Sequence, residues 1–180
     1  MSMQVGSTAP AFSAPALMGR EFTTVSLQEY LSQGKWVVLF FYPKDFTFVC
    51  PTEIVGFNDL VDDFADRNAV VIGASTDTVD SHLGWIKSDG RLQDLKFPLI
   101  GDVTKRMARD FGVLLDEQGI ALRGTFIMDP TGRVRWSSIY DLDIGRSIEE
   151  VLRVLDALQS GGLCACGWRE GDENIVVSSS

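Results

Sequence analysis

A continuous apolar run, Trp36 to Tyr42, limits the fold of this chain more than any other feature of its sequence. A strand with one wet face alternates apolar and polar residues, whereas this run does not, so it predicts a strand buried on both faces. Pro43 ends the run. A second run of the same kind, Ala69 to Ser75, predicts a second buried strand.

Helical spacing follows each of these strands. Apolar residues recur every three or four positions between Val49 and Ala65, which predicts an amphipathic helix with Pro51 in its first turn, where a missing N–H is harmless. Further helices are predicted over residues 81–88 and 104–111, and a short one is predicted between Ser26 and Gly34. The first 25 residues are expected to form an extended lead-in.

The last third of the chain predicts a different pairing. Residues 124–129 and 133–140 flank Pro-Thr-Gly and predict a β-hairpin, and Ser147 opens a last helix that Gly161 closes. Alternating elements followed by a hairpin predict an α/β fold, with a mixed sheet covered by helices on both faces and compatible with a thioredoxin-like core. We expect one domain over residues 3–160 and a C-terminal arm over residues 161–180.

Composition excludes several classes of function. A net charge of −9 over 180 residues argues against nucleic-acid binding, which needs a basic patch. The apolar runs are too short to span a membrane and the N-terminus does not resemble a signal peptide, so we expect a cytoplasmic protein. Three cysteines are too few for a disulfide scaffold and are expected to be inert, catalytic or metal-binding.

Cys50 has the placement of a reactive cysteine. It lies just past a buried strand and at the predicted start of a helix, which is where open α/β sheets hold their sites. Free backbone amides and the helix dipole favour an anion there, so the sequence predicts a thiolate. Free cysteine is also a common inert core residue, and that reading stays open on placement alone.

Three neighbours could assist such a thiolate. The Thr47 hydroxyl can donate to a bound oxygen, Pro43 can shield the sulfur without adding a donor, and Arg123 can stabilise developing negative charge. Each residue also has an ordinary structural reading. Thr47 could cap the helix, Pro43 could only end the strand, and Arg123 could form a surface ion pair.

The segment from Phe41 to Glu53, FYPKDFTFVCPTE, resembles the active-site signature of the typical two-cysteine peroxiredoxins, including the bacterial alkyl hydroperoxide reductase peroxidases. The family pattern Pro-x-x-x-Thr-x-x-Cys is met by Pro43, Thr47 and Cys50. The resemblance covers nearly the whole chain. Its other segments are residues 75–85, 97–102, 110–113, 123–129 and 141–147.

This resemblance implies a thiol-dependent peroxidase. The Cys50 thiolate would attack the O–O bond of hydrogen peroxide or an organic hydroperoxide and become a sulfenic acid. Thr47 and Arg123 would hold the peroxide, while Glu53 and Arg146 would orient Arg123. No cofactor is implied. The implied partners are a thioredoxin-type or dedicated flavoprotein reductase and a second copy of the chain, in an antiparallel homodimer and a decamer of five dimers.

The resemblance also implies a resolving cysteine in the arm, four residues before a tryptophan. Cys164 and Trp168 fit that frame, so Cys164 is expected to form an intersubunit disulfide with Cys50. The family usually has proline after this cysteine, and this chain has Ala165. Cys166 is an additional cysteine. It could compete for Cys50, form a strained bridge with Cys164 or take no part, and sequence alone favours the last.

Other functions remain alternatives at this stage. A redox-controlled chaperone or signalling protein could use the same cysteines. A thioredoxin-like disulfide reductase is disfavoured because the chain has no Cys-x-x-Cys. A metal site of His82 with Cys164 and Cys166 is disfavoured because structural zinc takes four ligands, and His82 is expected to be only a polar residue at a helix start.

Overall fold

The computed structural model of the protein describes residues 3–179. Its contacts divide the chain into two units, residues 1–146 and residues 147–180. The first unit holds the β-sheet, and the second holds helix α6 (Ile148–Ser160) with the segment that follows it. The predicted boundary between residues 160 and 161 stays a prediction.

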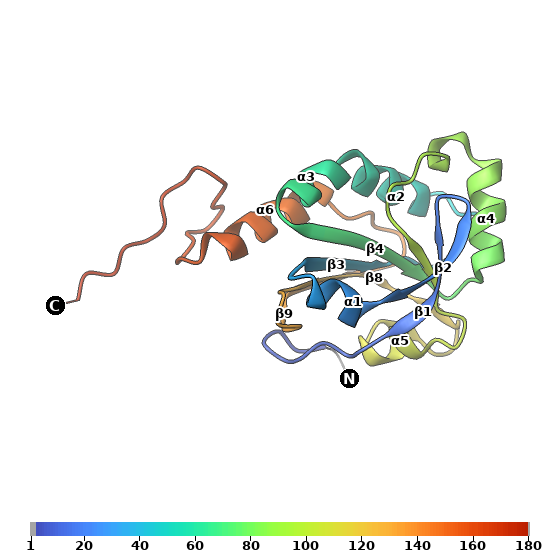
Figure 1. The fold of residues 1–180 in the computed structure, drawn as a ribbon, viewed down its shortest axis with the longest axis horizontal. Coiled ribbons are helices and arrows are strands. Elements are labelled where there is room, and N and C mark those ends of the chain that lie inside the picture. The colour runs from blue at the N-terminus through green and yellow to red at the C-terminus, as the bar shows by residue number, and fades with distance from the viewer. Residues whose placement is uncertain (1–2, 180) are drawn as a thin grey trace. The chain divides into compact units, whose positions relative to one another are not determined.

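The first unit is built on one seven-stranded sheet (Figure 1). Its strands lie in the order β2-β1-β5-β4-β3-β8-β9, with β3, β4 and β5 parallel and the other pairs antiparallel. The predicted α/β fold with a mixed sheet is thereby confirmed. The strands are β1 (Ser13–Met18), β2 (Glu21–Ser26), β3 (Trp36–Phe41), β4 (Ala69–Ser75), β5 (Leu99–Gly101), β8 (Arg123–Met128) and β9 (Val134–Tyr140), and β6 (Leu114–Leu115) pairs with β7 (Ile120–Ala121) apart from the sheet.

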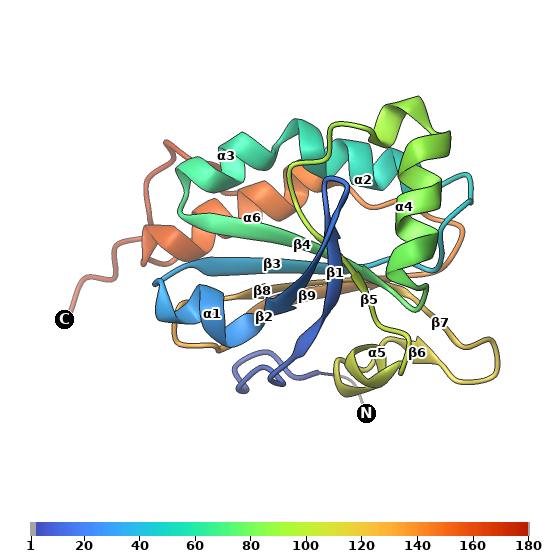
Figure 2. The same ribbon diagram turned by 45° about the vertical axis from the view of Figure 1, so that its right-hand side comes forward.

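Strand β3 is buried on both faces, as its sequence predicts. Because side chains alternate along a strand, Leu39 and Phe41 enter one core cluster, whereas Phe40 stacks on Phe57 from the opposite face, with 4.1 Å between the ring centroids. Helices α2 and α3 lie on one side of the sheet and α1 and α5 on the other (Figures 1 and 2). The helices of this unit are α1 (Leu27–Ser32), α2 (Cys50–Asp59), α3 (Val61–Asp66), α4 (Val79–Ser88) and α5 (Arg106–Asp110), with a 3-10 turn η1 at Gly90–Leu92.

The N-terminal segment differs from the predicted lead-in. Residues 13–26 form the hairpin β1–β2, which turns at Gly19 with a φ of 62° and lies at one edge of the sheet. Strand β1 joins the sheet through β5, a strand of three residues that sequence analysis missed. Pro15 and the small residues around it obscure the alternation of β1, although its exposed and buried positions do alternate over the first four residues.

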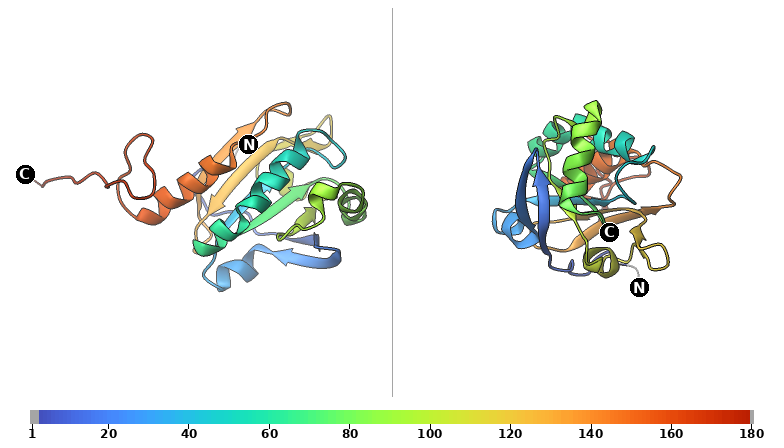
Figure 3. Two further views of the ribbon diagram at one scale, coloured as in Figure 1. Left: turned by 90° about the horizontal axis from the view of Figure 1, so that it is seen from above. Right: turned by 90° about the vertical axis from the view of Figure 1, so that its right-hand side faces the viewer.

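The helix predicted from residue 49 to residue 65 is interrupted. It divides into α2 and α3 at Leu60, whose φ of −104° and ψ of 6° are not helical. Close to the break, the Asn58 side chain accepts from Lys96 N at 2.9 Å and donates to Asp94 O at 3.1 Å. These bonds tie the end of α2 to a distant segment, a constraint that the apolar spacing alone does not show. In the view from above, α2 and α3 run along the sheet (Figure 3).

No helix within residues 3–179 is both long enough and apolar enough to cross a bilayer.

The packing of the sheet leaves no room for a side chain at Gly73 in β4. A Cβ there would lie 2.8 Å from Leu99 Cδ2 and 2.8 Å from Phe40 Cζ. We expect Gly73→Ala to lower the free energy of unfolding in urea by about 1–3 kcal/mol through overpacking. Gly90→Ala is the control, since a Cβ at Gly90 meets open space. Equal stability of the two variants would show that Phe40 repacks without cost.

Candidate active site

Antiparallel pairing of β3 with β8 assembles the site. Phe40 lies opposite Thr125, so the end of β3 lies beside the start of β8. The chain leaves β3 through a loop, residues 42–49, and enters α2 at Cys50, while Arg123 is the first residue of β8. Two residues that are 73 positions apart in sequence therefore become neighbours.

Cys50 lies at the start of α2 with its sulfur against a cation. Arg123 Nη1 donates to Cys50 Sγ at 3.3 Å, and Cys50 is fully buried. The N-cap residue, Val49, provides no side-chain cap, and Pro51 has no N–H of its own. The start of a helix and a guanidinium both favour a negative charge on this sulfur, although the amides of Thr52 and Glu53 donate to Val49 O.

Glu53, one turn further along α2, joins two arginines. Its Oε1 accepts from Arg123 Nη1 at 2.5 Å, and its Oε2 accepts from Arg146 Nε at 2.5 Å and from the Arg146 backbone N at 3.0 Å. Because the helix rises through one turn between Cys50 and Glu53, both side chains reach the same guanidinium. Glu53 therefore fixes the direction of Arg123 from the same helix that carries the sulfur.

Arg146 holds this group to the end of the sheet. Its guanidinium donates to Phe41 O at 2.6 Å, to Gly124 O at 3.0 Å and to Thr125 Oγ1 at 2.9 Å. Burial lowers the pKa of Arg146, and its contacts with Glu53 act in the opposite direction. The end of β3 and the start of β8 are thus fastened to one side chain, and Arg123 is itself held by Leu142 O at 2.8 Å.

The charges of this group do not balance without the sulfur. The side chains of Arg123, Glu53 and Arg146 are 4%, 1% and 2% exposed, and they carry two positive charges and one negative charge. An unbalanced charge away from water is costly. The sulfur of Cys50 lies 3.3 Å from Arg123 Nη1, where a negative charge would complete the group. The arrangement is therefore suited to a nucleophilic thiolate.

The loop before Cys50 carries the other two candidates. Pro43 is buried, and Thr47 is half-buried with its hydroxyl donating to Lys44 O at 3.0 Å. The alternative reading of Thr47 as a helix cap is wrong, because α2 has no side-chain cap. The alternative reading of Arg123 as a surface ion pair is also wrong, because the residue is 3% exposed.

A buried network that sequence analysis missed holds the same loop. Asp45, two residues after Pro43, accepts from the Tyr42 hydroxyl at 2.8 Å, and its Oδ2 lies 2.7 Å from His82 Nδ1. The backbone N of Asp45 donates to Asp77 Oδ2 at 2.9 Å. His82 was expected to be only a polar residue at a helix start, yet it is fully buried. Two signals in the sequence point to it: His82 is the only histidine of the chain, and it lies in the segment 75–85 that resembles the family.

The contacts of His82 fit the imidazolium form. Nδ1 faces the Asp45 carboxylate, and Nε2 lies 2.9 Å from Ile100 O, so both ring nitrogens face acceptors. Burial by itself lowers the pKa of His82, but the hydrogen bond and charge of Asp45, the Ile100 carbonyl and the charge of Asp77 outweigh it and raise that pKa above 6.5. Protonated His82 thus ties the loop to α4.

The arrangement of possible metal ligands differs from the one considered from sequence. Among residues 3–179, Asp45, Asp77 and His82 have ligand atoms within 4.8 Å of one another. This group contains no cysteine, and its atoms are already joined by hydrogen bonds. Cys164 and Cys166 belong to the second unit, in which Cys164 is half-buried and Cys166 is exposed.

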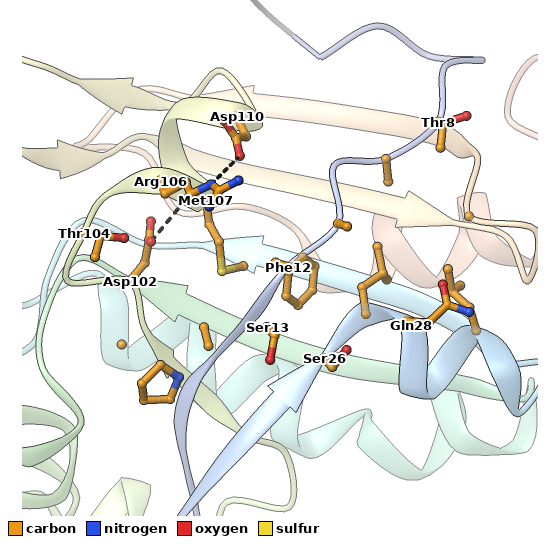
Figure 4. Close-up of a pocket in the computed structure, with 18 of the residues that line it drawn as sticks. Thr8, Phe12, Ser13, Ser26, Gln28, Asp102, Thr104, Arg106, Met107 and Asp110 are labelled. Atoms are coloured by element: carbon orange, nitrogen blue, oxygen red, sulfur yellow. Dashed lines mark hydrogen bonds and ion pairs between the residues drawn. The ribbon is translucent and has the colours of Figure 1, made fainter.

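A pocket of about 720 Å³ lies elsewhere in the first unit (Figure 4). It is lined by the N-terminal segment, α1 and α5, with Phe12 and Met107 among its apolar residues and the Arg106–Asp110 ion pair at its rim. None of the candidate residues lines it. The chemistry of the site therefore depends on the buried group at Cys50 and not on this pocket.

Comparisons with known proteins identify similar sequences and structures. The model of the AhpC/TSA family matches residues 5–137. The chloroplastic 2-Cys peroxiredoxin BAS1 of Spinacia oleracea is 49% identical to the chain, over 95% of this chain and 67% of that protein.

Solved structures show the same likeness. The reduced 2-Cys peroxiredoxin of Plasmodium vivax has a TM-score of 0.90 at 38% identity and covers 94% of this chain and 91% of its own. AhpC of Mycobacterium tuberculosis has a TM-score of 0.85 at 41% identity and covers 94% of this chain and 100% of its own.

The bridging role of Glu53 predicts a large loss of stability on neutralisation. We expect Glu53→Gln to lower the free energy of unfolding by about 3–5 kcal/mol, because two buried guanidiniums lose their carboxylate. The matched control is Glu150→Gln, which breaks the partly exposed pair with Arg153 and is expected to cost less than about 1 kcal/mol. Urea unfolding measures the stability of both variants. Similar losses of stability would contradict the role of Glu53 as a bridge between the two arginines.

The His82 contacts predict a pH dependence of stability. Because the folded pKa is raised above the unfolded value of about 6.5, protonated His82 stabilises the fold fully below that pH and loses its contribution as pH rises through the folded pKa. The stability difference between wild type and His82→Asn should therefore shrink with rising pH. Urea titrations from about pH 5.5 to 9 measure it, and a difference independent of pH would contradict the imidazolium.

Proposed function

The chain belongs to the AhpC/TSA family and is a typical two-cysteine peroxiredoxin, a thiol peroxidase, and we propose that Cys50 is the attacking thiolate and Cys164 the resolving thiol. One observation carries the first assignment. The buried group of Arg123, Glu53 and Arg146 has an excess positive charge, and the sulfur that would balance it lies 3.3 Å from Arg123.

The first step is attack on the peroxide by the Cys50 thiolate. The sulfur forms a bond to one oxygen, the O–O bond breaks, and the other oxygen leaves as water or an alcohol after taking up a proton. The result is a sulfenic acid. Arg123 faces the reacting sulfur and stabilises both the thiolate and the charge that develops on the leaving oxygen, while Glu53 and Arg146 keep it in position.

Thr47 and Pro43 have complementary roles in this proposal. In the absence of peroxide, the Thr47 hydroxyl donates to Lys44 O, and it is free to exchange this bond for one to a peroxide oxygen. Pro43 is buried and has no N–H to compete for the thiolate. Both residues lie on the loop that Asp45 ties down, which supports a fixed geometry for the peroxide.

Resolution requires Cys50 to leave its buried position. Because the residue is fully buried, another thiol reaches it only if the first turn of α2 opens, and helix ends open at low cost. The thiol of Cys164 of the partner subunit then attacks the sulfenic acid. This step forms a disulfide and releases water. A thioredoxin-type or flavoprotein reductase in the cytoplasm would reduce that disulfide with two electrons.

The edge of the sheet supports the proposed dimer. Strand β9 is the last strand, and β8 is its only partner strand in the described sheet. Val134 at its start bonds to Gly6 and Ser7, whereas Ile139 further along is 41% exposed. An unpaired edge strand offers its backbone groups to a second strand. A second copy of the chain, joined edge to edge and antiparallel, would satisfy it, and five such dimers would give the proposed decamer.

The two cysteine roles predict separable defects. Cys50→Ser is expected to abolish peroxide consumption, whereas Cys164→Ser is expected to allow a single turnover and to stop recycling by thioredoxin, because the sulfenic acid forms but no disulfide follows. A stopped assay of peroxide at equimolar enzyme measures the first step, and a coupled thioredoxin assay measures the second. Equal coupled activity of wild type and Cys164→Ser would refute the resolving role.

A further inference from the structure

The arm carries two thiols close together, Cys166 within a turn and Cys164 just before it. Trp168 N donates to Ala165 O at 3.0 Å, and Gly167 has a φ of 72°, which together mark a tight turn with Cys166 at its second position. Arg153 of α6 fastens the turn, because its Nη1 donates to Trp168 O at 2.7 Å while the same guanidinium pairs with Glu150. The side chain of Cys166 is left exposed.

Cys164, two residues earlier, is surrounded by polar groups. Asn174 Nδ2 lies 3.5 Å and Ser160 Oγ 3.4 Å from its sulfur, and these contacts hold it half-buried beside the end of α6. The pKa of Arg153 is raised, first by its hydrogen bond with Glu150 and further by the charges of Cys166 and Cys164. Arg153 is thus a cation of this segment, and it fixes the turn that carries Cys166.

We propose that Cys166 is a second resolving residue, which moves the disulfide from the subunit interface into the arm. This proposal rests on the proposed function, because its substrate is the disulfide between Cys50 and Cys164 of the partner subunit. The Cys166 thiolate attacks the Cys164 sulfur of its own arm, the bond to Cys50 breaks, and Cys50 leaves as a thiolate. One disulfide is lost and one is formed, so no external oxidant or reductant is needed.

The group around Cys50 provides the driving force. While Cys50 is held in a disulfide, its sulfur is neutral, and the buried pair of arginines faces Glu53 alone. Exchange returns an anion to Arg123 and lets the first turn of α2 close. A disulfide between residues two apart is strained. That strain opposes the exchange and also makes the product easy to reduce.

The exchange would make the disulfide accessible to a protein reductase. Cys50 is fully buried, whereas Cys166 is exposed on the turn. A protein reductase must bring its own sulfur into line with the disulfide that it attacks. A bridge between Cys164 and Cys166 places the oxidised pair on the arm, where such a protein can reach it. Sequence alone favours an idle Cys166, whereas its exposure on a turn two residues after Cys164 supports this bridge.

Disulfide mapping tests the proposal on the full chain. Wild type, Cys166→Ser and the control Ala165→Ser are treated with one equivalent of hydrogen peroxide, and free thiols are then blocked. We expect wild type and Ala165→Ser to yield a tryptic peptide of residues 154–169 that lacks two hydrogens and has no blocked cysteine. Cys166→Ser should instead accumulate the covalent dimer on non-reducing gels, and its reduction by thioredoxin should be slower.

The outcomes separate the two proposals. The exchange is overturned if wild type accumulates only the Cys50–Cys164 dimer and thioredoxin reduces wild type and both variants at the same rate. The peroxidase function would then be left intact. A protein that consumes no peroxide in any of the three forms overturns the proposed function itself. A bridge that forms equally fast in Cys50→Ser, which makes no sulfenic acid at that position, also overturns the exchange, because the arm would then be oxidised directly.

Discussion

The buried group of Arg123, Glu53 and Arg146 is the interaction on which the rest of the site depends. It contains two positive charges and one negative charge, and the sulfur of Cys50 lies where a second negative charge is needed. Structural ion pairs are normally complete, because an unpaired buried charge is expensive. In the proposed mechanism, the reactivity of Cys50 follows from this charge balance.

Two separate anchors hold the parts of the site in place. Arg146 joins the ends of β3 and β8 through Phe41 O and Gly124 O, which secures the cation. Asp45 and His82 secure the loop on the other side of the sulfur. Cys50 lies between these anchors on a helix end that has no side-chain cap. The reacting sulfur is thus attached to a helix end that opens easily, while the strands and the loop around it are held in place.

The sequence predicted the sheet and most of the site for identifiable reasons. The run from Trp36 to Tyr42 has no polar position, so a strand buried on both faces was the only consistent reading, and FYPKDFTFVCPTE is specific enough to name the family. Hairpin β1–β2 was missed because small residues and Pro15 weaken its pattern. The contacts of Arg146 with backbone carbonyls, and the burial of His82, depend on tertiary packing that no local pattern encodes.

The register between β3 and β8 has a consequence for how durable the catalyst is. Slipping that pairing by one residue would turn Arg123 to the opposite face of the sheet, so the register of the central strands secures its position. Opening of the first turn of α2 leaves the backbone pairing of β3 with β8 unchanged. In the proposed cycle, the strand that carries Arg123 therefore keeps its place while Cys50 moves, and each round of oxidation starts from the same backbone arrangement.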